Sequence, residues 1–274
     1  MKLSNYEIDL VIEETTTTIR AFSRATSKGF FPDFFVSNVN TTQSTSTSGS
    51  VTEAIGLAIS TPLTSADGAD IFQGTAEVSA ITDTVAIADA LAISEAMDDA
   101  VDMRVTVLGD AFATVTGNAI AVGIDSSSTV SSGDGADLIL GQAIYRGAIG
   151  PEVNATTIGI RGGSYDLGNG NDIVRAIASG GGINIGVQDV LIDGGEGADT
   201  FELQSGTGVV IGGGGDDLLL LEGSKTDYTF TALTSSLGVS IQKNGTNLTV
   251  SDVESFQFAG DLAMTYQYTD LFTV

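Results

Sequence analysis

The chain of 274 residues contains no cysteine, no histidine and no tryptophan, and it has only three prolines. Without cysteine there is no disulfide framework and no thiolate chemistry. The lack of histidine removes the commonest general base, the usual zinc ligand and every Ser-His or Cys-His dyad. Any metal bound by this chain must therefore accept oxygen ligands, which indicates a hard cation such as calcium or magnesium.

Basic residues are also scarce, at 10 against 35 acidic ones, and the formal net charge is −25. Such a surface repels nucleic acid and anionic lipid and attracts cations, so we expect no nucleic-acid partner. No run of 18 apolar residues is present, so we expect no membrane insertion. Residues 1–20 lack the apolar core and cleavage site of a Sec-type signal peptide, which taken alone favours the cytosol. With 42% hydrophobic residues the chain can still bury a core.

Glycine and aspartate, by contrast, recur in repeated turns that each lead into a short apolar segment. The shared pattern is G-x-D followed by two mostly apolar residues, and its aspartates are Asp70, Asp137, Asp172, Asp199 and Asp217. Their spacings are 67, 35, 27 and 18 residues, and VTVLG (105–109) aligns with DLILG (137–141) as a worn copy that divides 67 into 35 and 32. A second marker recurs in step, as AVGID (121–125), TIGIR (157–161) and NIGVQ (184–188). Two markers in phase predict a repeat protein.

The repeats predict an all-β fold, a parallel β-solenoid or β-roll, because glycine-rich turns interrupt many short β-branched segments. Residues 80–97 fit both a strand and a helix period, and we favour strands. Turns of equal phase would stack about 4.8 Å apart. Glycines could then aim carbonyl oxygens inward, so that an aspartate closes an oxygen cage suited to calcium. The alternative is that these Asp-Gly turns hold no ligand.

GGEGADTFE (194–202) and GGGGDDLLL (212–220) resemble the nine-residue G-G-x-G-x-D-x-U-x repeat of hemolysin-type calcium-binding (RTX) proteins. The longer units look like those of cyanobacterial RTX-like secreted proteins, and the resemblance covers residues 65–223 well and 224–262 more weakly. It implies a β-roll in which calcium is bound by turn carbonyls and by the aspartate at the sixth motif position. The implied ligands are Asp70, Asp137, Asp172, Asp199 and Asp217, with Asp67, Asp134, Asn169 and Asp216 as weaker candidates. GGGGDD is interpreted as shifted by one residue from the motif.

Three regions are expected. Residues 1–64 form an N-terminal capping or assembly segment with the aromatic cluster FFPDFF (30–35) and a Ser/Thr-rich linker or edge strand (36–52). Residues 65–223 form the β-solenoid of RTX-like coils, and residues 224–274 form a strand-rich flank. The flank ends in YTDLFTV (268–274), which is similar to the uncleaved C-terminal signals of type I secretion. The resemblance therefore implies a secreted, extracellular protein of the cell surface.

No catalytic residues are expected. The repeats hold no lysine and only scattered arginines, and no carboxylate pair stands out beyond the turns. The leading hypothesis is a secreted calcium-binding structural protein that self-assembles into a surface filament, sheath or matrix, and the aromatic cluster favours it. The alternative is a monomeric calcium-stabilised adhesin or binding module with cell-surface polysaccharide as its partner, which the acidic C-terminal flank favours. A polysaccharide-active β-helix enzyme is a third alternative, and the irregular coil lengths disfavour an ice-binding face.

Overall fold

The structure is a computed structural model, and its described residues build an all-β protein with mostly parallel strands. Side chains are described for Ile59 and, from residue 120 onward, within the described ranges. The backbone is described for residues 6–9, 17–27, 34–43, 52–59, 63–64, 71–80, 84–94, 106–115, 119–146, 155–234, 238–261 and 264–272.

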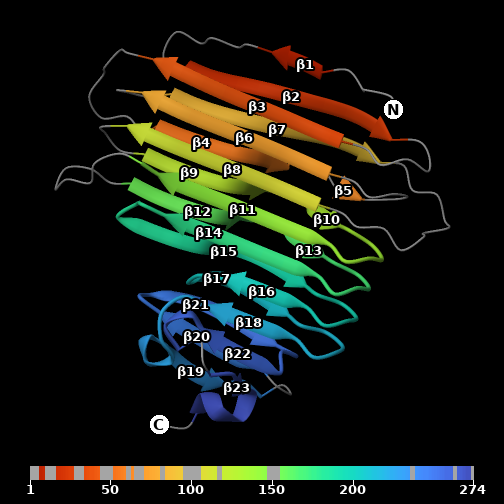
Figure 1. Cartoon of the computed structure of the whole chain (residues 1–274), viewed down its shortest axis with the longest axis vertical. Helices are drawn as coiled ribbons and strands as arrows, with labels where there is room; N and C mark the ends of the chain where they lie inside the picture. Colours follow the sequence, from red (N-terminus) through yellow and green to blue (C-terminus); the bar gives the residue numbers. More distant parts are fainter. Residues whose placement is uncertain are drawn as a thin grey trace.

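One sheet has nine strands, and every neighbouring pair in it is parallel except the last, β22–β23. It forms the front layer in Figure 1. In spatial order the strands are β3 (Phe34–Gln43), β6 (Ile71–Ala80), β8 (Thr106–Val115), β11 (Leu138–Tyr145), β14 (Ile173–Ser179), β16 (Thr200–Leu203), β18 (Leu218–Leu221), β22 (Ser255–Phe258) and β23 (Tyr266–Gln267).

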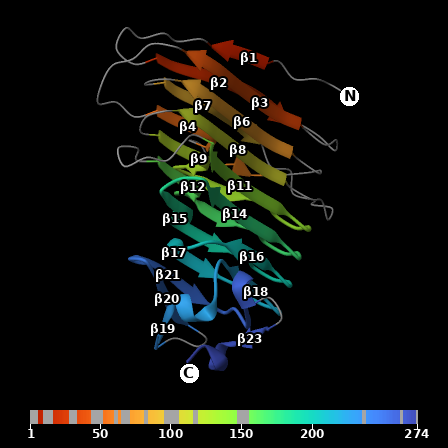
Figure 2. The ribbon, with the colours of Figure 1, turned by 60° about the vertical axis from the view of Figure 1, so that its left-hand side comes forward.

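The other sheet has fourteen strands and lies behind the first, as the turned view of Figure 2 shows. Its main path is β1 (Tyr6–Asp9), β2 (Thr17–Ser27), β7 (Thr84–Ser94), β4 (Thr52–Ile59), β9 (Ala119–Ser126), β12 (Ala155–Arg161), β15 (Ile183–Asp193), β17 (Gly206–Ile211), β21 (Thr246–Ser251), β20 (Val239–Lys243) and β19 (Thr229–Ala232). The short strands β5 (Leu63–Thr64), β10 (Thr129–Ser131) and β13 (Ser164–Asp166) pair beside this path. The described helices are three short 3-10 turns, η1 (Lys225–Asp227), η2 (Ala259–Asp261) and η3 (Tyr268–Phe272).

From β8 to β18 the chain passes alternately through the two sheets and adds each new strand beside the previous one. We call the segment between two successive passages through the nine-stranded sheet a coil. Along that sheet Ile71 pairs with Thr106, Thr106 with Leu138, Leu138 with Ile173, Ile173 with Thr200 and Thr200 with Leu218. These pairs are 35, 32, 35, 27 and 18 residues apart. The predicted coil lengths are confirmed, including the worn copy at 105–109.

The second marker is confirmed as well, and it has a packing reason. AVGID, TIGIR and NIGVQ stack in register in the fourteen-stranded sheet, with Ile124 opposite Ile160 and Ile160 opposite Val187. The glycine in each marker faces backbone atoms on the side of the nine-stranded sheet. A Cβ on Gly159 would lie 2.8 Å from the backbone nitrogen of Ile177 in the facing sheet. Only glycine allows the two backbones to come this near.

Alternation of buried and half-buried residues places one core between the sheets. In β11 and β14 every second side chain is buried. A column of inward apolar residues runs along the nine-stranded sheet, and its members are Ile139, Val174, Phe201, Leu219 and Phe256, each at most 1% exposed. Burial of such side chains stabilises the fold by about 1.5–3 kcal/mol each.

The two ends of the stack differ. At the C-terminal end β19, β20 and β21 form an antiparallel meander, and β23 closes the other sheet. At the N-terminal end β3 is an edge strand of ten residues that pairs with β6 alone among the described residues. This strand covers part of the Ser/Thr-rich segment expected as a linker or an edge strand. Within the 80–97 region residues 84–94 are β7, a strand as favoured. Phe30 and Phe31 lie outside the described residues.

Replacement of Gly159 by alanine should lower the free energy of unfolding by about 2 kcal/mol or more, because a well-packed interior responds to added volume with backbone shifts. Gly182→Ala is the matched control, since its Cβ would meet only the carbonyl oxygen of Ala155 at 3.8 Å. Urea unfolding followed by circular dichroism measures both. Equal midpoints for the two variants would contradict the close approach of the sheets.

Candidate functional site

Four of the predicted aspartates stack in a column in the nine-stranded sheet, where each lies directly before the first residue of β11, β14, β16 or β18. The Asp137 amide donates to Asp172 Oδ1 at 2.7 Å, that of Asp172 to Asp199 Oδ1 at 2.8 Å, and that of Asp199 to Asp217 Oδ1 at 2.9 Å. Each of these carboxylates thus accepts a hydrogen bond from the backbone amide of the aspartate one coil earlier. Glu254 ends the column, because its Oε2 accepts the amide proton of Asp217 at 2.9 Å. We call these five residues the aspartate column.

The turns before these aspartates continue the ladder between coils. Asp134, Asn169, Glu196 and Gly214 lie opposite one another at the third motif position. The Gly170 amide donates to the Glu196 carbonyl at 2.8 Å, and the Gly197 amide donates to the Gly214 carbonyl at 2.6 Å. The carbonyls at this position therefore bind neighbouring turns, instead of all pointing inward as the cage hypothesis expected.

Stacking of the turns explains why glycine recurs at the second and fourth motif positions. Gly195 has φ 90° and Gly197 has φ 136°, values that other residues rarely adopt. A Cβ on Gly195 would also overlap the carbonyl of Gly168, and one on Gly197 would overlap that of Gly170. Each turn can thus lie directly on the one before it, which brings the aspartates within hydrogen-bonding reach.

The second oxygen of three aspartates of the column is buried without a hydrogen-bond partner. Asp172, Asp199 and Asp217 are at most 1% exposed, and the Oδ2 atom of each lacks a partner. An unsatisfied buried carboxylate oxygen is costly, so such atoms usually indicate a proton or a ligand. Burial raises the pKa of Asp172 to about 7 and that of Asp217 to about 6. It also raises the pKa of Asp199. The amide bonds at Oδ1 lower these pKa values without offsetting the burial.

Backbone oxygens lie beside two of these atoms. A Cβ on Gly194 would meet both Asp199 Oδ2 and the carbonyl oxygen of Gly212. A Cβ on Gly212 would likewise meet Asp217 Oδ2 and the carbonyl oxygen of Asp252. At these two steps the column thus combines a carboxylate oxygen with a carbonyl oxygen of the next coil. That donor set fits calcium, which takes six to eight oxygens at about 2.3–2.6 Å.

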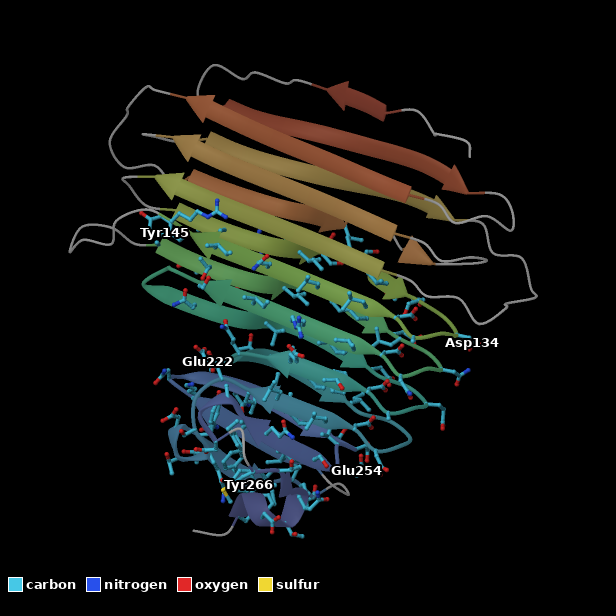
Figure 3. The ribbon with its side chains drawn as sticks, in the orientation of Figure 1. Asp134, Tyr145, Glu222, Glu254 and Tyr266 are labelled. Atoms are coloured by element: carbon cyan, nitrogen blue, oxygen red, sulfur yellow. The ribbon has the colours of Figure 1, made fainter. Side chains whose placement is uncertain are left out.

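The weaker candidates lie outside the column. Asp134 and Asn169 are exposed at the tips of the turns, where Asn169 Nδ2 donates to Asp134 Oδ1 at 2.6 Å. Asp216 is exposed beside Asp217. Asp67 and Asp70 lie outside the described residues. Figure 3 shows Asp134 and Glu254 on one edge of the molecule, opposite Tyr145 and Glu222.

One detail of the sequence interpretation is wrong. GGGGDD is not shifted by one residue, because Gly214 lies opposite Glu196 and Leu218 lies opposite Thr200. The sixth motif position is therefore Asp217 in this turn and Asp199 in the turn before it. Four consecutive glycines gave no internal landmark for the alignment, and the following leucines were the better guide.

Glu254 is the residue that the sequence interpretation missed. It precedes β22 as Asp217 precedes β18, since Leu218 pairs with Ser255. It does not follow a glycine-rich turn, and its coil of 37 residues contains the antiparallel meander. The only signal was the alternation of SFQF (255–258), which matches the strands that follow the aspartates.

Among the described side chains, no three acidic groups converge in a way that could hold a metal ion. A cation on the column would therefore depend largely on backbone carbonyls. Within the same residues, no helix is long and apolar enough to cross a membrane. No protein-family model matches the chain, and no curated protein or solved structure matches it either.

The ligand-free chain should lose stability as the pH rises from about 4 to above 7. The folded-state pKa values of Asp172 and Asp217 lie above the ordinary value, at about 7 and about 6. Their contribution is thus fully present below the unfolded pKa and is lost as the pH rises through the folded one. The melting temperature in chelator should be higher at pH 5 than at pH 8.

Asp172→Asn supplies the control, because asparagine keeps an acceptor for the Asp137 amide and cannot ionise. This variant should show a smaller fall in melting temperature over the same pH range. A wild-type melting temperature that rises steadily from pH 5 to pH 8 in chelator would contradict the buried, unpaired state of the carboxylates.

Proposed function

We propose that this chain is a calcium-binding protein in which divalent ions complete the aspartate column. The observation that carries the proposal is the row of buried Oδ2 atoms of Asp172, Asp199 and Asp217 that lack hydrogen-bond partners. At neutral pH each must hold a proton, lie charged in a poorly solvated site or bind a cation. A calcium ion at each step removes both the desolvation cost and the repulsion between neighbouring carboxylates.

The fold that we propose is a parallel β-solenoid of RTX-like coils. Its support is the single register that runs through β6, β8, β11, β14, β16 and β18, together with the stacked turns. In such a stack every coil contacts only its neighbours, so an ion bound between two turns stabilises the interface of both. Calcium is abundant outside cells, and we therefore propose a secreted, extracellular protein of the cell surface.

A structural role fits better than a catalytic one. Two of the scattered arginines are held in ion pairs on the strands, Arg161 with Asp125 and Arg175 with Glu202. Most of the described residues belong to the two sheets. We therefore propose that the stacked coils themselves serve the structural role.

Self-association is proposed through the N-terminal end. Among the described strands β3 is an edge strand of ten residues, and a long edge of this kind can add another strand, whereas the edge strands at the C-terminal end, β19 and β23, have only four and two residues. A single long edge strand favours end-to-end pairs, and a filament, sheath or matrix then requires lateral contacts as well. The closed C-terminal end is the observation that favours the alternative, a monomeric adhesin or binding module for polysaccharide.

Calcium should raise the melting temperature of the chain, and the paired change Asp199→Ala with Asp217→Ala should remove most of that rise. The two carboxylates lie on consecutive steps of the column and supply its buried ligands. Asp67→Ala with Asp70→Ala is the comparison, and it should have the smaller effect. Thermal melts followed by circular dichroism, with and without chelator, decide the matter. Equal losses in the two double variants would show that the ranking of the sites is wrong.

Electron microscopy of negatively stained chain in millimolar calcium tests the assembly. We expect end-to-end pairs or longer assemblies that separate in chelator, because the ions hold the stacked turns together. Discrete single particles in both conditions would overturn self-association and favour the monomeric binding module.

A further inference from the structure

The turn before Glu254 departs from the repeat pattern and still ends at the column. Ser251 pairs with Ile211 and Ser255 with Leu218, so three residues (252–254) replace the six of the preceding turn (212–217). The shorter turn has no glycine. Glutamate, with one more methylene than aspartate, nevertheless brings its Oε2 to 2.9 Å from the Asp217 amide nitrogen.

An unpaired ligand atom faces this last step. Asp217 is 0% exposed, and its Oδ2 has no hydrogen-bond partner. The carbonyl oxygen of Asp252 lies beside it, because both atoms would meet a Cβ on Gly212. Asp252 holds this place with φ 53°, an unfavourable value for a residue other than glycine. A carboxylate oxygen, a carbonyl oxygen and the Glu254 carboxylate are thus gathered at one step.

Negative charge gathers at this step of the described column. Three carboxylates act on that of Asp217, namely those of Asp199, Glu254 and Asp216. Asp199 likewise lies among three carboxylates, those of Asp172, Asp193 and Asp217. A divalent cation relieves more repulsion where more carboxylates surround it.

Packing that needs no ion fixes the position of Glu254. Val253, directly before it, and Phe256, two residues after it, are each 0% exposed. Phe258, two residues further along β22, contacts the rings of Tyr228, Phe230 and Tyr266 at centroid distances of 5.5, 6.0 and 5.6 Å. A metal-binding side chain whose backbone is fixed by such packing loses little conformational freedom when the ion binds, which favours affinity.

We propose that the step between Asp217 and Glu254 is a divalent-cation site outside the glycine-rich turns, and that it binds calcium most tightly of the described steps. Its ligands are Asp217 Oδ2, the Asp252 carbonyl oxygen and the Glu254 carboxylate, with Asp216 adding charge nearby. This inference rests on the proposed function, since it ranks one site within the calcium-binding column.

Calcium titration of the full chain by isothermal calorimetry, after chelator treatment, tests the proposal with Glu254→Gln. Glutamine keeps an acceptor for the Asp217 amide but removes the charge. We expect the tightest binding event to weaken by about tenfold or more, since even groups that only support a metal ligand contribute that much to affinity. Glu222→Gln is the matched control, since this exposed glutamate lies on the opposite edge (Figure 3), and it should leave the titration unchanged.

The possible outcomes distinguish a failure of the proposed function from a failure of the proposed site at Glu254. If the wild-type chain binds no calcium, the proposed function fails. If it binds calcium and Glu254→Gln titrates like Glu222→Gln, only the ranking and the role of Glu254 are overturned. Should circular dichroism show that Glu254→Gln does not fold, Glu254→Asp replaces it. That variant keeps the charge but withdraws the carboxylate from the Asp217 amide, and the same weakening is expected.

Discussion

The structure depends on the bond between a buried aspartate and the backbone amide of the aspartate one coil earlier. This bond fixes the phase of successive turns, because Asp172 reaches the amide of Asp137 only when the turns lie directly on each other. It also satisfies just one carboxylate oxygen of Asp172, Asp199 and Asp217. The order that holds the coils in register therefore creates a row of charged atoms that water does not reach, and this row requires protons or cations.

Glycine makes that arrangement sterically feasible in two places. In the turns it allows positive φ and direct stacking on a carbonyl, as at Gly195 over Gly168. Between the sheets it allows close approach, as at Gly159 facing Ile177. The coils can consequently vary from 18 to 37 residues in length without losing phase, since the extra residues extend strands such as β11 and β12 or the loops between strands.

Much of this arrangement could be predicted from sequence, because stacked coils keep equivalent residues in equal phase. The worn copy at Thr106 and the four buried aspartates were found in that way. The hydrogen bond from one aspartate to the next could not be predicted, since spacing carries no information on side-chain rotamers. Glu254 could not be predicted, because a coil with an antiparallel meander and a short turn breaks the sequence period. Its place in the column depends on the pairing of β22 with β18, which restores the register.

A crystal structure of the chain grown in calcium, with an anomalous difference map, tests the central claim most directly. The claim predicts anomalous peaks beside the Oδ2 atoms of Asp172, Asp199 and Asp217, with carbonyl oxygens of the adjacent coil among the ligands. Peaks confined to the exposed turn tips at Asp134 and Asn169, or no peaks along the column at neutral pH, would contradict it.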